Sequence, residues 1–287
     1  MTTPAMNDGV ASARPWKKRL VVAAWAVGVA AILGAGLYVG VHRPASDARR
    51  RSTWKAPSGA QIERDEIYML LAYAVAARGW QVEGPAKRGF NVGAVLVDSS
   101  GSNALFWARN CNVLLQNATQ HAELRLMLGY LDAARVYNLM GYTVYVTLEP
   151  CAQCAGMMTM TGVRRVVYGQ RDPEYGRAFE RLQLDTRGNP GRLRGGWKGS
   201  YGPYPRAVRV SRSATNYGAR LEEAYKRSKQ DLPDFLCSES AKAVFDEARR
   251  ALDEYRVRYE ENQSILSSAR KMLEQVPAEF VPLGLRM

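Results

Sequence analysis

Four residues in two short motifs carry the side chains from which a metal site can be built. His121 and Glu123 stand two positions apart, and Cys151 and Cys154 stand three positions apart. Zinc prefers imidazole nitrogen and thiolate sulfur in a tetrahedral site, and a catalytic zinc keeps its fourth position for water. Two cysteines at this spacing share one turn at a helix N-terminus, where the helix dipole favours thiolates. The pattern predicts a catalytic zinc held by His121, Cys151 and Cys154, with Glu123 placed to move a proton of that water.

Two other interpretations use the same residues less completely. A structural zinc site normally has four protein ligands, and Cys111 could be the fourth. A redox dithiol would need only the two cysteines of the Cys-x-x-Cys motif and would leave His121 and Glu123 without a role. The chain has two histidines, and His42 directly follows an apolar segment, so His121 is the histidine available to a folded site. These observations favour the catalytic interpretation.

Both motifs are expected to begin a helix, and the surrounding pattern predicts the elements that position them. Apolar residues at helical spacing predict an amphipathic helix over 63–79, and a β-branched run predicts a strand over 91–97. The other expected strands cover 104–109, 143–147, 165–169 and 207–210; the other expected helices cover 121–134, 151–161, 217–229 and, as one long helix or two, 238–275. This succession predicts an α/β fold with three layers, α/β/α, around a mixed sheet.

The chain contains a His-x-Glu motif and, further along, a Pro-Cys-x-x-Cys motif. The two motifs in this order are the signature of zinc deaminases that act on nucleobases. Residues 62–230 resemble the cytidine/deoxycytidylate deaminase superfamily, and within it bacterial tRNA adenosine deaminase. The resemblance rests on VGAVLV (92–97), HAEL (121–124) and VYVTLEPCAQCAGMMTMTGVRRVVYGQRD (144–172). The chain differs from that group at Asn91, where a proline is usual.

The resemblance implies a fold and a reaction. The implied fold is a five-stranded sheet between layers of helices, and the implied assembly is a homodimer. Asn110 is expected to contact the nucleotide, and the backbone of Ala122 and Glu123 is expected to line a base pocket. In the implied reaction, water attacks C6 of adenine or C4 of cytosine, and Glu123 passes a proton to the leaving ammonia.

The net charge of +13 is unevenly distributed. Residues 1–61 carry nine basic and two acidic side chains, 62–175 carry ten of each, and 176–287 carry twenty-one and fifteen. No acidic residue lies between Asp185 and Glu222. This stretch contains eight basic residues with aromatic residues among them. Arginines that contact phosphates and aromatic rings that stack on bases suit a single-stranded or looped nucleic acid. Four residues of this loop are the candidates for such contacts: Arg192, Arg194, Trp197 and Lys198.

This loop has another interpretation. Its cations could simply be solvated, with the tyrosines packed locally. The same positive field could also attract the phosphate of a free nucleotide.

The N-terminal part of the chain contains a candidate membrane anchor. Leu20–Val41 is 22 residues long without a charge, enough for a helix to cross a hydrocarbon layer of roughly 30 Å. A cleavable signal peptide is the alternative, but its apolar region is normally about 7–15 residues. The sequence therefore predicts a polar terminus (1–19), a single-pass anchor (20–41), a basic linker (42–61), a zinc deaminase domain (62–230) and a helical C-terminal extension (231–287).

The distribution of charge does not indicate on which side of the membrane the catalytic domain lies, because basic residues flank Leu20–Val41 almost equally. Reduced thiolates and nucleic acid are both cytoplasmic, so a cytoplasmic catalytic domain is expected.

The expected function is zinc-dependent hydrolytic deamination of adenine or cytosine in a tRNA-like or single-stranded nucleic acid. One alternative is a deaminase of a free nucleoside, nucleotide or base. Another, of a different class, is a non-catalytic nucleic-acid-binding protein with a structural zinc.

Overall fold

The computed structural model describes residues 56–82, 88–179 and 208–278, and from Pro57 onward the chain forms one compact unit. The predicted anchor Leu20–Val41 lies outside these residues, as do the four loop candidates Arg192, Arg194, Trp197 and Lys198. Within the described ranges, none of the helices combines the length and apolar character that crossing a membrane requires.

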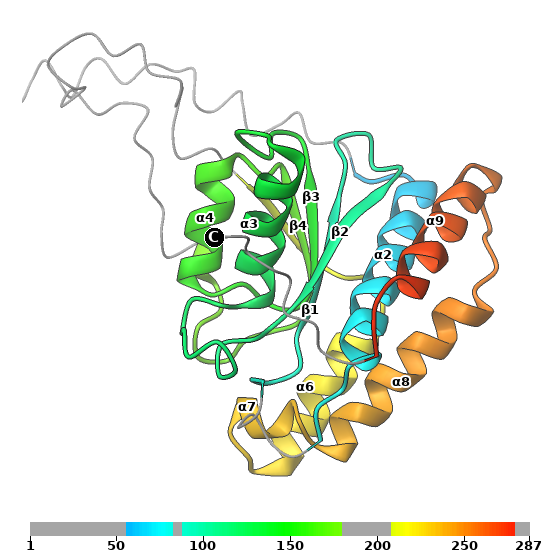
Figure 1. The fold of residues 1–287 in the computed structure, drawn as a ribbon. Coiled ribbons are helices and arrows are strands. Elements are labelled where there is room, and N and C mark those ends of the chain that lie inside the picture. The colour runs from blue at the N-terminus through cyan, green and yellow to red at the C-terminus, as the bar shows by residue number, and fades with distance from the viewer. Residues whose placement is uncertain (1–55, 83–87, 180–207, 279–287) are drawn as a thin grey trace, which may run out of the picture. The chain divides into compact units, whose positions relative to one another are not determined.

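A five-stranded mixed sheet lies at the centre of this unit (Figure 1). Its strand order is β2-β1-β3-β4-β5, in which β1 pairs antiparallel with β2 and β3, while β3, β4 and β5 pair parallel. The strands are β1 (Gly93–Val97), β2 (Ala104–Arg109), β3 (Thr143–Leu148), β4 (Arg165–Gln170) and β5 (Arg209–Arg212). The sheet confirms the predicted α/β class and mixed pairing. The last strand, predicted over 207–210, runs over 209–212.

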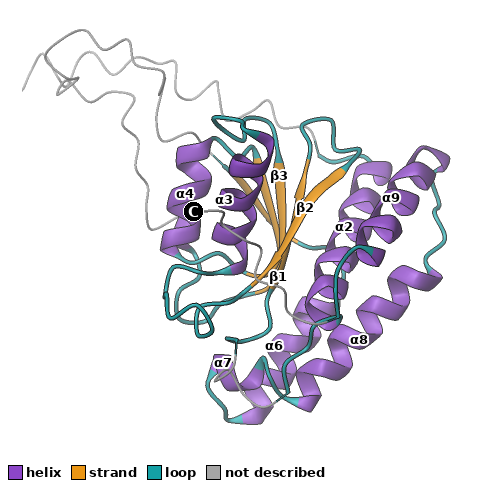
Figure 2. Cartoon of the chain, in the orientation of Figure 1, coloured by secondary structure: helices purple, strands orange, loops and turns teal. Residues whose placement is uncertain are grey.

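Helices cover both faces of the sheet (Figure 2). One face carries α3 and α4, whose N-termini hold the two motifs, and the other carries α2 and α6. The helices are α2 (Gly59–Ala77), α3 (Ala122–Ala134), α4 (Ala152–Thr161), α6 (Tyr217–Ser228), α7 (Leu232–Phe235), α8 (Glu239–Glu254), the short 3-10 helix η2 (Glu260–Asn262) and α9 (Gln263–Glu274). Because both faces are covered, all five residues of β1 are buried.

The helix α2 is covered on every side, although its sequence predicts an amphipathic helix. The ten successive residues Ile67–Ala76 are all buried. The sheet packs on one side of α2, and α8 and α9 pack on the other (Figure 1). A helix in that position has no solvent-facing stripe over this stretch, so the prediction of an amphipathic helix is wrong for its second half. The C-terminal helices thus complete the core.

Two arginines help to fasten the C-terminal helices. Arg78 donates a hydrogen bond to the Leu273 carbonyl at 2.7 Å, and Arg109 donates one to the Pro277 carbonyl at 2.6 Å. Cations near the carbonyl end of a helix typically stabilise it by about 0.3–1 kcal/mol. Part of the chain's basic content therefore serves the fold.

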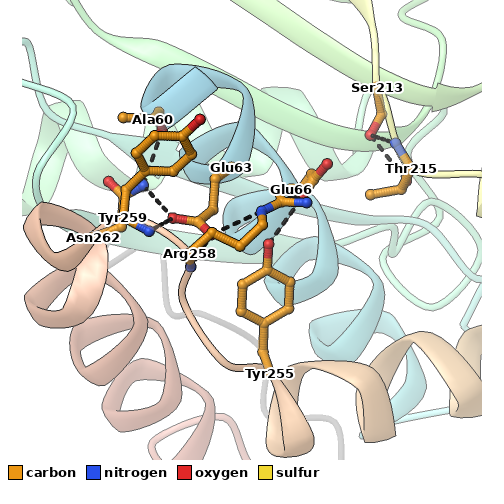
Figure 3. Close-up of polar contacts among 9 residues, drawn as sticks. All are labelled: Ala60, Glu63, Glu66, Ser213, Thr215, Tyr255, Arg258, Tyr259 and Asn262. Atoms are coloured by element: carbon orange, nitrogen blue, oxygen red, sulfur yellow. Dashed lines mark hydrogen bonds and ion pairs between the residues drawn. The ribbon is translucent and has the colours of Figure 1, made fainter. Parts of the chain in front are cut away.

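A buried carboxylate on α2, Glu63, holds the segment between α8 and α9 (Figure 3). It accepts hydrogen bonds from the Arg258 amide, from the Tyr259 amide at 3.1 Å and from Asn262 Nδ2 at 2.8 Å. Glu66, on the same side of α2, forms an ion pair with the Arg258 guanidinium at 2.6 Å. The backbone amides that point at Glu63 are not available to a continuous helix, so the predicted helical region 238–275 forms two helices.

This cluster gives a test of stability. Burial alone raises the pKa of Glu63, but the hydrogen bonds from Arg258, Asn262 and Tyr259 outweigh it and hold the pKa below its ordinary value. We expect Glu63→Gln to lower the free energy of unfolding by about 2–3 kcal/mol at pH 7, because a buried acceptor of charge-assisted hydrogen bonds is lost.

A group whose pKa is lowered on folding contributes stability above its unfolded pKa, and that contribution is lost as the pH falls through the folded pKa. The difference between Glu63→Gln and the parent, measured by urea unfolding, should therefore be complete at pH 7 and shrink below pH ~4.3, the ordinary pKa of glutamate. The exposed Glu260 provides the control, since Glu260→Gln should leave stability unchanged within about 0.5 kcal/mol. An equally small effect of Glu63→Gln would contradict the assignment.

Candidate metal centre

The three candidate zinc ligands come from the N-termini of two neighbouring helices. His121 is the N-cap residue of α3 and Cys151 is the N-cap residue of α4, and neither side chain forms a capping hydrogen bond. Both side chains are therefore free to face each other. Cys154 lies in the first turn of α4 and is fully buried. The positive ends of two helix dipoles lie at this site and favour thiolate sulfur.

The ligand atoms have the spacing of a tetrahedral zinc site. His121 Nδ1 lies 3.5 Å from Cys151 Sγ and 3.6 Å from Cys154 Sγ, and the two sulfurs are 3.7 Å apart. Zinc bonds of about 2.3 Å to sulfur and about 2.0–2.1 Å to nitrogen at tetrahedral angles require about 3.8 Å between sulfurs and about 3.6 Å between sulfur and nitrogen. All three separations agree with these values, so the residues fit a zinc ion with one further coordination position.

The two thiols have opposite pKa shifts. The hydrogen bond between the sulfurs, followed by that with His121, lowers the pKa of Cys151 to about 4. The same bond to Cys151, together with burial, raises the pKa of Cys154. The hydrogen bond to Cys151 also raises the pKa of His121. These three side chains thus share protons through hydrogen bonds. A metal ion binds thiolate and neutral imidazole, so it would displace those protons.

Glu123 lies in the first turn of α3 and is 5% exposed. Burial raises the pKa of Glu123 to about 7, against the lowering effect of His121. A carboxyl group with a pKa near neutrality can both accept and donate a proton at physiological pH, which is what general acid–base catalysis needs. It also lines the cavity at the metal centre.

That cavity has a volume of about 610 Å³, large enough for a nucleobase and its sugar. Four apolar side chains contribute walls: Phe90, Val92, Leu148 and Leu232. His121 and Cys151 lie in the lining, as do both residues expected to contact the substrate, Asn110 and Ala122. The structure therefore brings together, at one pocket, all the candidates in its described part except Cys154, which is fully buried and meets His121 and Cys151 at the metal centre.

Asn110 has a free acceptor in this pocket. Its Nδ2 donates to the Phe90 carbonyl and to Asn112 Oδ1, both at 3.2 Å, which fixes the orientation of the amide. Its Oδ1 is buried and has no hydrogen-bond partner among the described residues. A buried acceptor without a partner is costly, so Asn110 Oδ1 is suited to receive a hydrogen bond from a ligand.

Cys111, the alternative fourth ligand, is not part of the centre. It is buried, but the group of described residues that could share a metal ion consists of His121, Cys151 and Cys154. Burial raises the pKa of its thiol, against the lowering effect of the Arg125 and Arg88 guanidinium groups. The structural-zinc interpretation that used Cys111 is therefore wrong.

Sequence reasoning missed much of the pocket's rim. Glu149 lies within the stretch 144–172 that carries the resemblance and Asp172 ends it, but neither carries a signal in the sequence for a place in the lining. Glu174 and Tyr175 follow directly. Asp231–Pro233 comes from far along the chain and carries no motif, so no local signal could have placed it there.

Comparisons with known proteins agree with this centre. The family model of the cytidine and deoxycytidylate deaminase zinc-binding region matches residues 62–170. The tRNA-specific adenosine deaminase of Bacillus subtilis is 34% identical over 115 residues, which are 40% of this chain and 67% of that protein. The enzyme of the same name from Haemophilus influenzae is 36% identical over 93 residues, 32% of this chain and 53% of that protein.

A solved structure from a study of A-to-I editing by tRNA:A34 deaminases is 27% identical, with a TM-score of 0.33, and the match covers 43% of this chain and 78% of that one. The chain spans between about half and two thirds of the length of the two curated relatives named above. The region that the family model matches includes His121, Glu123, Cys151 and Cys154. The chain therefore belongs to the cytidine and deoxycytidylate deaminase family of zinc-dependent deaminases.

Proposed function

We propose that this protein hydrolytically deaminates an adenine or cytosine base presented by a nucleic acid. The observation that carries the proposal is the convergence of His121, Cys151 and Cys154, at tetrahedral spacing, with the buried carboxyl of Glu123 in one pocket. The names of the relatives, tRNA-specific adenosine deaminase, support adenine in RNA as the substrate. The basic loop with Arg192, Arg194, Trp197 and Lys198 is proposed to contact phosphates and bases.

Each residue has a separate task in this proposal. Zinc held by His121, Cys151 and Cys154 would make water acidic enough to react at neutral pH. Glu123 would accept a proton from water and deliver it to the departing amine. The apolar side chains of Phe90, Val92 and Leu148 exclude bulk water, and Asn110 Oδ1 accepts a hydrogen bond from the substrate.

A second candidate is a free nucleoside or base. The pocket lining contains five carboxylates and, among the described residues, no lysine or arginine. Such a lining offers no cation to bind a phosphate at the reacting unit. An uncharged substrate is compatible with it.

One experiment separates the two candidates. Zinc-loaded protein is incubated with RNA, with single-stranded DNA and with a panel of free nucleosides and bases, and the products are identified by mass analysis of nucleosides. Inosine or uridine formed within a polynucleotide supports the first candidate, and products from free nucleosides alone support the second. Absence of deamination in every sample would refute the proposed function.

We further propose that the protein works as a homodimer anchored to a membrane by Leu20–Val41, with the catalytic domain in the cytoplasm. The support is the uncharged length of that segment and the family resemblance. Added protease should leave residues 57–287 intact in spheroplasts and digest them after lysis. Digestion from outside intact spheroplasts would contradict the orientation. Sedimentation of the detergent-solubilised protein at the mass of a monomer would contradict the dimer.

A further inference from the structure

One wall of the pocket comes from beyond the region that the family model matches. The connection between α6 and α7 supplies Asp231 to the lining, and the first turn of α7 supplies Leu232 and Pro233, whereas the family model ends at residue 170. These three residues belong to the part of the chain predicted as a C-terminal extension. The extension therefore contributes to the metal-centre pocket as well as to the core.

This wall is held in place by backbone and core contacts. Asp231 caps α7, its Oδ1 accepting from the Asp234 amide and its carbonyl from the Phe235 amide, both at 2.9 Å. Leu232 is buried in the core. At the end of α7, the Leu236 carbonyl accepts a hydrogen bond from Asn91 Nδ2 at 2.9 Å. The carboxylate of Asp231 is therefore kept at the pocket.

Asn91 links this wall to the first strand. It is fully buried and stands between Phe90 and Val92, which line the pocket. A proline at this position, as the resemblance would have it, has no side-chain amide that could donate to Leu236. The asparagine side chain thus joins the extension to Gln81 and Arg88, with which it also forms hydrogen bonds.

The wall increases the negative charge of the rim. Asp231 and Glu174 are exposed, and Glu149 and Asp172 are buried at the pocket, where they accept hydrogen bonds from backbone amides of residues 172–177. Neutral backbone amides add no positive charge to the rim. The two thiolates of the metal centre would balance the charge of a zinc ion, so the metal would not neutralise the rim.

The pocket also shows where the ligand's polar contact lies. Asn110 Oδ1 is a buried acceptor without a partner in the described part of the chain, and an acceptor calls for an N–H or O–H donor. A phosphate has acceptor oxygens at neutral pH and cannot satisfy it. The unpaired acceptor therefore suits a donor of the base or the sugar, and the charge of the rim disfavours a phosphate beside it.

We infer that the α6–α7 connection, through Asp231, completes an acidic rim that excludes phosphate, so the pocket takes an uncharged nucleoside or base unit and discriminates against nucleoside monophosphates. This inference rests on the proposed deaminase function and names the substrate class within it. In a polynucleotide, the same rim requires the flanking phosphates to lie away from the α6–α7 connection.

The test is equilibrium binding, which does not depend on turnover. Zinc-loaded Glu123→Gln protein, in which substrate should not be consumed, is titrated calorimetrically with adenosine and cytidine and with their 5′-monophosphates at low salt. We expect the nucleoside to bind about tenfold more tightly than its monophosphate, and the ratio to fall at high salt. Adding Asp231→Asn, which keeps a good helix cap but removes the charge, should reduce the ratio about three- to fivefold.

Asp234→Asn is the matched control, because Asp234 is also an exposed acid of α7 but does not line the pocket. It should change the ratio by less than about twofold. A monophosphate that binds as tightly as the nucleoside would overturn the inference, as would equal effects of Asp231→Asn and Asp234→Asn or failure of all these ligands to bind at millimolar concentration. Failure of the proposed function is a different result, namely no deamination of any substrate by the zinc-loaded parent.

Discussion

Glu123→Gln is expected to lower kcat by about 10³-fold or more while zinc remains bound, since general acid–base catalysis typically contributes 10²–10⁴ and both proton transfers here depend on one group. Glutamine has nearly the same size as glutamate, so the pocket and the metal centre should retain their geometry. The carboxyl of Glu123 is not among the three atoms that form the tetrahedral set. Zinc content, measured by atomic emission, should equal that of the parent.

The matched control for this variant removes a carboxylate from the same pocket. Glu174 lines the rim, and Glu174→Gln should leave kcat for a nucleoside or RNA substrate within a few-fold of the parent. Loss of zinc in Glu123→Gln would mean that Glu123 is a ligand or supports one. Full turnover without its carboxyl would assign the proton transfer to another group.

The metal centre could be predicted from sequence because its chemistry is local. Cys151 and Cys154 lie three positions apart within one helical turn, so their spacing implies that both can reach one ion. The deaminase signature joins His121 and Glu123 to them. The comparisons confirm the superfamily resemblance, the zinc-dependent deaminase class and the zinc cofactor that these motifs predict. Alternation and β-branched runs likewise identified the strands of the sheet.

The other features of the fold and of the pocket depend on contacts between segments that are distant in the sequence. Nothing near Glu63 in the sequence indicates that its carboxylate meets the amides of Arg258 and Tyr259. Asn91 departs from the family pattern, and the Leu236 carbonyl to which it donates lies 145 residues further along the chain. Asp231 has no neighbouring motif and reaches the pocket only because the chain folds back after α6. Hydrophobic periodicity indicates the apolar face of one element but not what covers its other faces, so it predicts an amphipathic helix at α2, where Ile67–Ala76 are all buried.

Cys154→Ala is expected to abolish stoichiometric zinc binding and all measurable deamination. Cys154 is fully buried between His121 Nδ1 at 3.6 Å and Cys151 Sγ at 3.7 Å, and alanine offers no ligand in its place. Two remaining ligands cannot hold zinc in the tetrahedral set that three protein ligands and a water complete. The variant should also unfold at a lower temperature than the zinc-loaded parent, because an ion that binds only the folded state stabilises it by mass action.

Cys111→Ala is the matched control, as a buried cysteine outside the centre. It should keep the zinc content of the parent, and its melting temperature should fall when a chelator removes the metal, as that of the parent does. Cys154→Ala should show no such response to chelator, because its centre is already without the ion. The tetrahedral spacing of one nitrogen and two sulfurs leaves no role for Cys111 and no substitute for Cys154. Zinc retained by Cys154→Ala, or zinc lost by Cys111→Ala, would therefore overturn the ligand assignment.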